Sequence, residues 1–120
     1  MITLTVKQIN NPVFIPAFIK LRKEVQWKNL SCNMAIIQLA KEIDSFLKDS
    51  REIFADIQKN YTFKNEEGKE AMSEEGVAKI NELFETKRNT RIKLFKREDV
   101  YSSNLTSDEY DSVKEIFVPN

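Results

Sequence analysis

The segment from Lys87 to Arg97 carries the residues best suited to binding chemistry in this sequence. It holds six cations and no carboxylate among eleven residues, and Phe95 lies among them. Cations at this density could contact phosphate groups, and an exposed phenyl ring could stack on a base. Acidic blocks border the segment on both sides, so charge pairing explains it equally well. The candidates for contact with nucleic acid or an acidic partner are Lys87, Arg88, Arg91, Lys93, Lys96 and Arg97.

Carboxylates at helical spacing are the next candidates. Glu42 and Asp49 lie seven residues apart, and Glu52 and Asp56 lie four apart. Either pair could bind a divalent cation or act as acid and base. Lysine and arginine side chains are interleaved with them at helical spacing, which favours the solvated face of a helix instead.

The sequence contains no histidine, one cysteine and two glycines. Serine–histidine and cysteine–histidine nucleophiles are therefore excluded within this chain, and a zinc site is not expected. Cys32 falls at an expected helix N-terminus, which lowers a thiol pKa in general, but it has no base beside it. Two glycines could hardly build a phosphate-binding loop. We therefore expect no enzyme activity, no metal and no cofactor.

Charge and hydropathy predict a soluble intracellular protein. Nineteen cations balance nineteen carboxylates, so there is no global attraction to nucleic acid or to an anionic membrane. The lone cysteine rules out an internal disulfide, which fits a reducing compartment. The first seven residues lack the basic start and apolar run of a signal peptide, and no apolar stretch approaches the roughly 20 residues of a membrane span.

Residues 32–61 show the clearest helical pattern, with Ser31 as the expected N-cap. Additional apolar residues, Leu39, Phe46 and Ile53, flank the main stripe and widen it, which is typical of a helix packed on more than one neighbour. The main stripe advances in alternating steps of four and three through Ile36, Ala40, Ile43, Leu47, Ser50, Phe54, Ile57 and Tyr61.

The remaining patterns complete a single α+β domain over residues 1–120, mainly α. It comprises a long helical hairpin, a small two-stranded antiparallel sheet and a capped C-terminal helix, where Thr106 and Glu109 form a capping box. The other expected elements are a strand at 2–8, a helix from Pro16 to Trp27, a loop at 62–72, a helix at 74–87 capped by Ser73 and a strand at about 90–97. The two strands are expected to pair, because each alone would be marginal.

This order of segments resembles that of small uncharacterised phage and prophage proteins. The resemblance rests on "ITLTVKQI", the long helix "AIIQLAKEIDSFLKDSREIFADIQKNY", the loop "NEEGK", the helix "INELFE", a basic strand and the closing "LTSDEYDSVKEI". It spans nearly the whole chain and assigns no site residue. It implies a phage product of the structural or assembly genes.

We therefore expect a non-enzymatic phage structural or virion-assembly protein that works through protein–protein contacts, as a homo-oligomer or on virion components. Its place would be the cytoplasm of an infected bacterial host or the virion. The expected partner surface is the end of the long helix, at Phe54, Ile57 and Tyr61. The alternative is a small nucleic-acid-binding or regulatory protein that uses residues 87–97.

Overall fold

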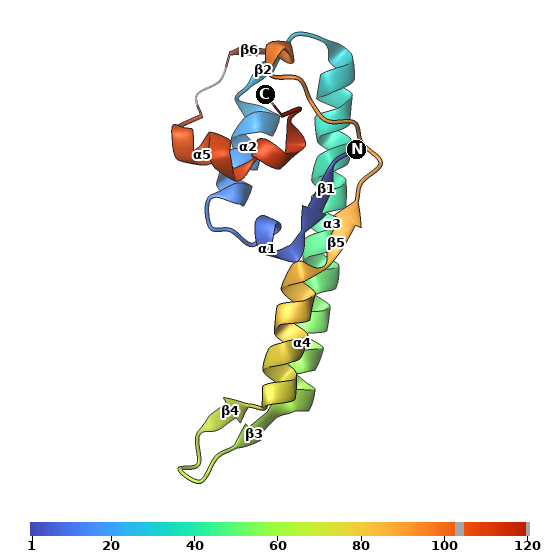
Figure 1. Ribbon diagram of the computed structural model, residues 1–120. Helices are drawn as coiled ribbons and strands as arrows, with labels where there is room; N and C mark the ends of the chain where they lie inside the picture. The colour runs from blue at the N-terminus through green and yellow to red at the C-terminus, as the bar shows by residue number, and fades with distance from the viewer. Residues whose placement is uncertain (103–104, 120) are drawn as a thin grey trace.

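One helix of 32 residues, α3 (Leu30–Tyr61), runs through most of the length of the molecule (Figure 1). The computed structural model describes residues 1–102 and 105–119, and the molecule measures 60 × 27 × 24 Å. We call the group of elements around the first half of α3 the head (residues 1–47, 86–102 and 105–119). The narrow extension below it is the arm (residues 48–85).

The head joins short elements from both ends of the chain. Antiparallel pairing places Leu4 opposite Arg88 in one sheet and Trp27 opposite Val100 in another. The expected pairing of the first strand with a strand at about 90–97 is met only in part, because the first strand pairs antiparallel with Lys87–Asn89 instead. The elements of the head are β1 (Thr3–Thr5), α1 (Val6–Ile9), α2 (Phe14–Lys23), β2 (Gln26–Trp27), β5 (Lys87–Asn89), β6 (Val100–Ser102) and α5 (Ser107–Ser112), with short 3-10 helices at Arg97–Asp99 and Lys114–Ile116.

Both predicted strands differ from the observed ones in extent. The first ends at Thr5, whose side chain forms a capping box with Gln8 and starts α1. The prediction of a strand at about 90–97 was wrong, because β5 occupies Lys87–Asn89 instead. Arg91 has a positive φ of 59°, a conformation that no regular strand accommodates, so the chain leaves the sheet there.

Helix α2 begins at Phe14, two residues before the expected start. Pro16 is its third residue, and its missing N–H is tolerated there because first-turn donors have no partner within the helix. The helix ends at Lys23, so Trp27 belongs to β2, and its indole Nε1–H donates to the Leu21 carbonyl at 3.0 Å.

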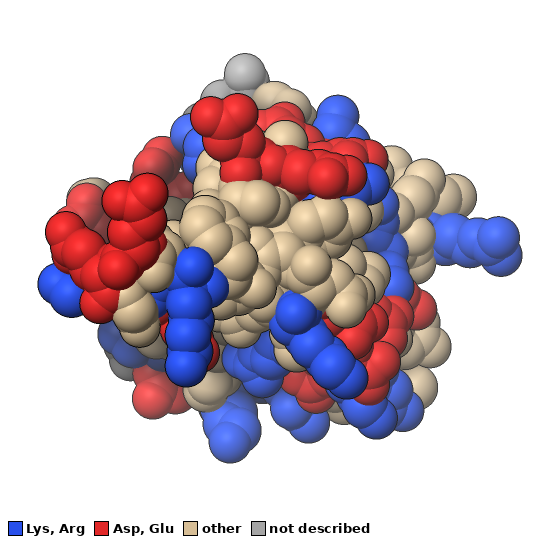
Figure 2. All heavy atoms as spheres, turned by 90° about the horizontal axis from the view of Figure 1, so that it is seen from below, with Lys and Arg blue, Asp and Glu red and all other residues tan. Residues whose placement is uncertain are grey.

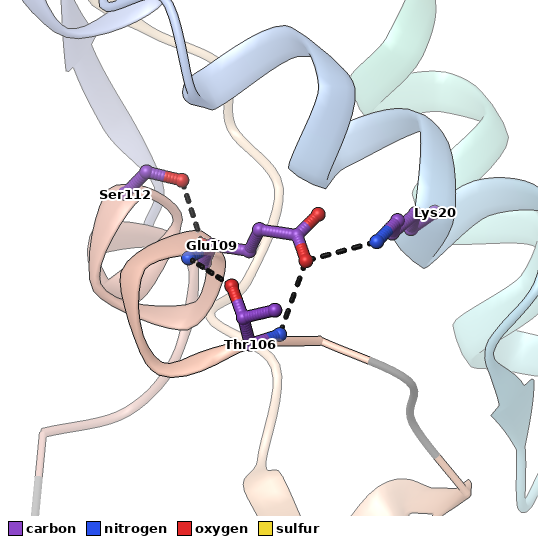
Figure 3. A network of polar contacts seen from close by, with 4 residues as sticks. All are labelled: Lys20, Thr106, Glu109 and Ser112. Atoms are coloured by element: carbon purple, nitrogen blue, oxygen red, sulfur yellow. Dashed lines mark hydrogen bonds and ion pairs between the residues drawn. The ribbon is translucent and has the colours of Figure 1, made fainter.

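The elements of the head are held together by a cluster of aromatic side chains and by a network of polar contacts next to it. The Trp27 ring lies 4.9 Å from that of Phe95, and Phe117 packs against both. Beside this cluster, Glu109 accepts from Lys20 Nζ at 2.9 Å and from the Thr106 N–H at 3.1 Å (Figure 3). The expected capping box of the C-terminal helix is confirmed, and the Lys20 contact ties α5 to α2.

The arm consists of the second half of α3, the antiparallel helix α4 (Glu74–Glu85) and a β-hairpin at the tip. Ser73 caps α4 as expected. Residues 62–72 were predicted as a loop, but they form the strands β3 (Thr62–Lys64) and β4 (Glu70–Met72) around a turn at Gly68, whose φ is +77°. Overall, the expected α+β, mainly α architecture is confirmed.

Candidate protein-interaction surfaces

The six predicted cations lie along the return path from the arm into the head, and two of them contact side chains of neighbouring elements. The Arg88 guanidinium is 2.7 Å from an Asp49 oxygen and lies 4.7 Å above the centre of the Phe46 ring. The Arg97 guanidinium lies 4.7 Å above the Tyr110 ring. Intramolecular pairing therefore accounts for Arg88. The exposed members of the group are Lys87, Arg91, Lys93, Lys96 and Arg97.

Phe95 cannot stack on a nucleic-acid base in this fold, so that expectation was wrong. Its side chain is only 4% exposed and packs against Trp27 and Phe117. The backbone of Phe95 also exchanges hydrogen bonds with the last turn of the chain, donating to the Ile116 carbonyl and accepting from the Val118 N–H. Phe95, which interrupts the alternation of apolar and charged residues in this segment, is therefore a core residue in backbone that forms no regular strand.

Cys32 lies at the start of α3, and its environment is the opposite of that of a reactive thiol. Asn29, rather than Ser31, is the N-cap, because its side-chain oxygen accepts from the Cys32 N–H at 3.0 Å. Burial raises the pKa of the Cys32 thiol, and the nearby Asp99 carboxylate raises it further. The general lowering of a thiol pKa at a helix N-terminus is therefore overridden here.

The paired carboxylates of α3 lie in different environments. Glu52 and Asp56 are exposed, Glu42 is half-buried, and Asp49 is paired with Arg88. Within residues 1–102 and 105–119, no group of three or more acidic or cysteine side chains is placed to hold a metal ion.

The expected partner surface on the arm is divided between two environments. Ile57 is buried and faces the contact between α3 and α4, whereas Phe54 and Tyr61 remain half-exposed. Two further apolar side chains of the arm, Ile53 on α3 and Val77 on α4, are each 48% exposed. The two helices of the arm therefore cover only part of their own apolar surface.

Two grooves lie along the arm, the first of them at its junction with the head, and the two differ in charge. The first, which we call the neutral groove, has a volume of about 420 Å³ and contains one charged residue, Arg51. The second, the charged groove, has a volume of about 340 Å³ and contains Asp56, Lys79 and Glu82. The neutral groove is lined by Val6, Asn10, Ser50, Arg51, Phe54, Ala55, Gln58, Leu83 and Phe84.

A second apolar surface, which the sequence analysis missed, lies on the head end of α3. Leu30, Met34 and Ile37 are all exposed, and Leu30 is 82% exposed. Their spacing of four and three places them on one face of the helix, roughly opposite the buried face that carries Ile36 and Leu39. The same spacing rule that identified the core stripe would have identified this one.

No family model, curated protein or solved structure matches this chain. Among the described residues, no helix has both the length and the apolar character needed to cross a membrane. Function must therefore be inferred from the surfaces themselves.

Proposed function

We propose that this chain is a non-enzymatic phage structural or assembly protein that acts through protein–protein contacts made by its arm. The supporting observation is the incomplete burial of the arm: two helices and a hairpin project from the head with apolar side chains open on both flanks. An amphipathic helix gains most of its stability from packing its apolar face. The exposed and partly exposed apolar side chains of the arm are thus best explained by a protein that covers them; they include Ile53, Phe54, Tyr61, Phe63 and Val77.

The distribution of charge supports the same proposal. Viewed along the molecule from the arm end, an uncharged area fills the middle and charged side chains gather around it (Figure 2). Interfaces have this arrangement, because a desolvated centre excludes charges while a charged rim sets orientation. A phage origin and a place in the infected cytoplasm or the virion are part of the proposal, and they rest on the pattern resemblance of the sequence.

The test is whether the arm carries the chain's protein contacts. Size-exclusion chromatography coupled to light scattering, over a range of protein concentrations, would measure self-association. Co-purification with the products of neighbouring phage genes would measure contacts with other components. We expect a double variant, Ile53→Lys with Val77→Lys, to lose these contacts. A control, Gln38→Lys with Ala78→Lys, adds the same charge at exposed positions away from the grooves and should retain them. A chain that is monomeric at all concentrations and binds none of those products would contradict the proposal.

Nucleic-acid binding is a second candidate, favoured by the exposed cations of the return path. No ion pair is formed by the side chains of Arg91, Lys93 or Lys96 within the described residues. Their joint replacement by glutamate should abolish salt-sensitive binding, if this function holds. Lys41, Lys48 and Lys59, which are exposed on α3, provide a control triple with the same change in net charge. Equal binding by both triple variants would eliminate this candidate.

A further inference from the structure

We propose that the outer face of the β1–β5 sheet binds the sugar–phosphate backbone of a nucleic-acid duplex and does not read its base sequence. This inference rests on the second candidate function, and it names both the surface that makes the contact and the form of nucleic acid that the surface holds. We call this surface the strand face; it comprises Thr3, Thr5, Lys87, Asn89, Arg91 and Lys93.

The two strands of this sheet come from the two parts of the sequence in which cations have no carboxylate among them. Residues 1–23 contain four lysines and arginines and no carboxylate, and residues 87–97 contain six and none. Antiparallel pairing of β1 with β5 brings these two parts side by side (Figure 1). All nineteen carboxylates lie in the rest of the chain, so the fold gathers positive charge here although the net charge is zero.

The register of the pairing shows which side chains turn outward. Leu4 and Arg88 lie opposite each other on the face that turns towards α3, where Arg88 is paired with Asp49 and Leu4 is buried. Neighbouring residues of a strand point to opposite faces of a sheet, so the flanking positions turn away from α3. Those positions hold Thr3, Thr5, Lys87 and Asn89.

Arg91 lies at the apex of an outward loop that is fastened to Ile2 on both sides. The Ile2 carbonyl accepts from the Thr90 N–H at 3.0 Å, and the Ile2 N–H donates to the Ile92 carbonyl at 2.7 Å. The Arg91 N–H donates to the Asn89 side-chain oxygen, and the φ of Arg91 is 59°. A non-glycine residue in this conformation is uncommon, and irregularities of this kind between paired strands re-aim a side chain. The loop therefore presents the Arg91 guanidinium to solvent at the end of the sheet.

The three cations of the strand face are available to phosphate groups. Lys87, Arg91 and Lys93 are exposed, and none of them forms an ion pair within the part of the chain that the structure describes. Threonine hydroxyls and asparagine amides, which lie among these cations, also bind phosphate and sugar oxygens in protein complexes with DNA. Glu85 and Glu115 lie only at the margins of the surface.

The same composition favours a duplex over a single strand. Proteins that hold single strands add aromatic side chains on which successive bases stack. Phe95 is the only aromatic residue within residues 1–9 and 87–97, and it is 4% exposed and packed against Trp27. Without a ring to stack on bases, the surface contacts phosphates, which a duplex presents at high density. Its affinity should therefore not depend on base sequence.

Arg91→Gly tests the strand face without disturbing the fold, because glycine adopts a positive φ freely. We expect this variant to bind a short duplex about fivefold more weakly in low salt. The slope of log affinity against log salt concentration should become shallower by about 0.9, the value for one lost phosphate contact. Adding Lys87→Gln and Lys93→Gln should raise the loss to about a hundredfold. Fluorescence anisotropy measures the affinities, and thermal melting followed by circular dichroism confirms that each variant is folded.

A matched control triple removes the same charge from exposed positions on α3: Lys41→Gln, Lys48→Gln and Lys59→Gln. It should bind the duplex nearly as the wild type does. In the wild type, duplexes of different base sequence should bind equally, and a single strand of the same length should bind more weakly. Polyglutamate of matched charge, which imitates an acidic protein partner, should not compete.

The outcomes separate this inference from the functions proposed above. Equal weakening by the two triple variants, or tighter binding of the single strand, overturns the inference and leaves nucleic-acid binding to another surface. Competition by polyglutamate also overturns it, because the strand face would then be a site for an acidic protein. A chain that binds no nucleic acid contradicts both the inference and the second candidate function, while co-purification still decides the assembly role of the arm.

Discussion

The head and the arm are built on the same helix, yet they bury it to different degrees. In the head, α3 is covered by α1, α2 and the strands, and its inward residues Ile36 and Leu39 are almost fully buried. In the arm, α4 is the main cover, and Phe54 on the same stripe remains half-exposed. A continuous apolar stripe therefore indicates which face of a helix packs, but it does not indicate how much of that face the chain itself covers.

Phenylalanine truncation should give the largest difference between the two regions. Phe14 in the head is fully buried, so Phe14→Ala should lower the free energy of unfolding by about 3–5 kcal/mol. Phe54→Ala in the arm should lower it by about half as much in the monomer, because Phe54 already has part of its surface in water. Urea unfolding, followed by circular dichroism at a concentration below self-association, measures both values.

Equal losses of unfolding free energy in the two variants would contradict the expected difference between head and arm. They would mean that the arm is as well packed as the head without any partner. A Phe54→Ala loss that grows with protein concentration would instead show that another chain covers Phe54.

A methyl group at Gly76 should have a smaller and more local effect. A Cβ there would lie 2.6 Å from both the Met72 Cγ and the Tyr61 Cβ. The methionine can move, but the Tyr61 Cβ is fixed to the helix, so α3 and α4 must separate at the tip. We expect Gly76→Ala to destabilise the arm by about 1–2 kcal/mol, even though alanine favours a helix by about 1 kcal/mol.

Hydrogen exchange would locate this effect. Amides of β3, β4 and the first turns of α4 should exchange faster in Gly76→Ala, while those of the head should not change. Gly68→Ala is the control at the other glycine: nothing lies within 4 Å of an added Cβ, but the φ of +77° strains a side chain, so only the hairpin turn should respond. Faster exchange throughout the head would show that the two regions unfold as one.

Most helices of this fold could be predicted from the sequence, whereas most of its strands could not. Caps and stripes act locally, so the long helix and the Ser73 and Thr106 caps were recognisable, whereas the Asn29 cap and the hairpin within residues 62–72 were not. The position of strand β5 depended on the positive φ of Arg91, which no local sequence pattern specifies. Of the candidate surfaces, the exposed cations and the partly exposed Phe54 could be named from the sequence, but the burial of Phe95 and the lining of the grooves depend on elements distant in sequence.

The smallest expected difference concerns two ion pairs, one in each region. Glu109 in the head accepts from Lys20 and from the Thr106 N–H, and the Lys20 contact is the main cause that lowers the pKa of Glu109. Glu67 in the arm lies 3.9 Å from Lys69, with both side chains largely exposed. Such exposed pairs contribute little to stability.

Glu109→Gln should therefore lower the melting temperature at neutral pH, whereas Glu67→Gln should leave it unchanged. A carboxyl group whose pKa is lowered by folding stabilises the protein above its unfolded pKa, and this contribution is lost as the pH falls through the folded pKa. The difference between wild type and Glu109→Gln should therefore be largest near pH 7 and should vanish in acid, below the ordinary carboxyl range. A difference that persists unchanged into acid would show that Glu109 acts through its hydrogen bond to the Thr106 N–H, which glutamine retains in part, or through packing, rather than through the charge that ties α5 to α2.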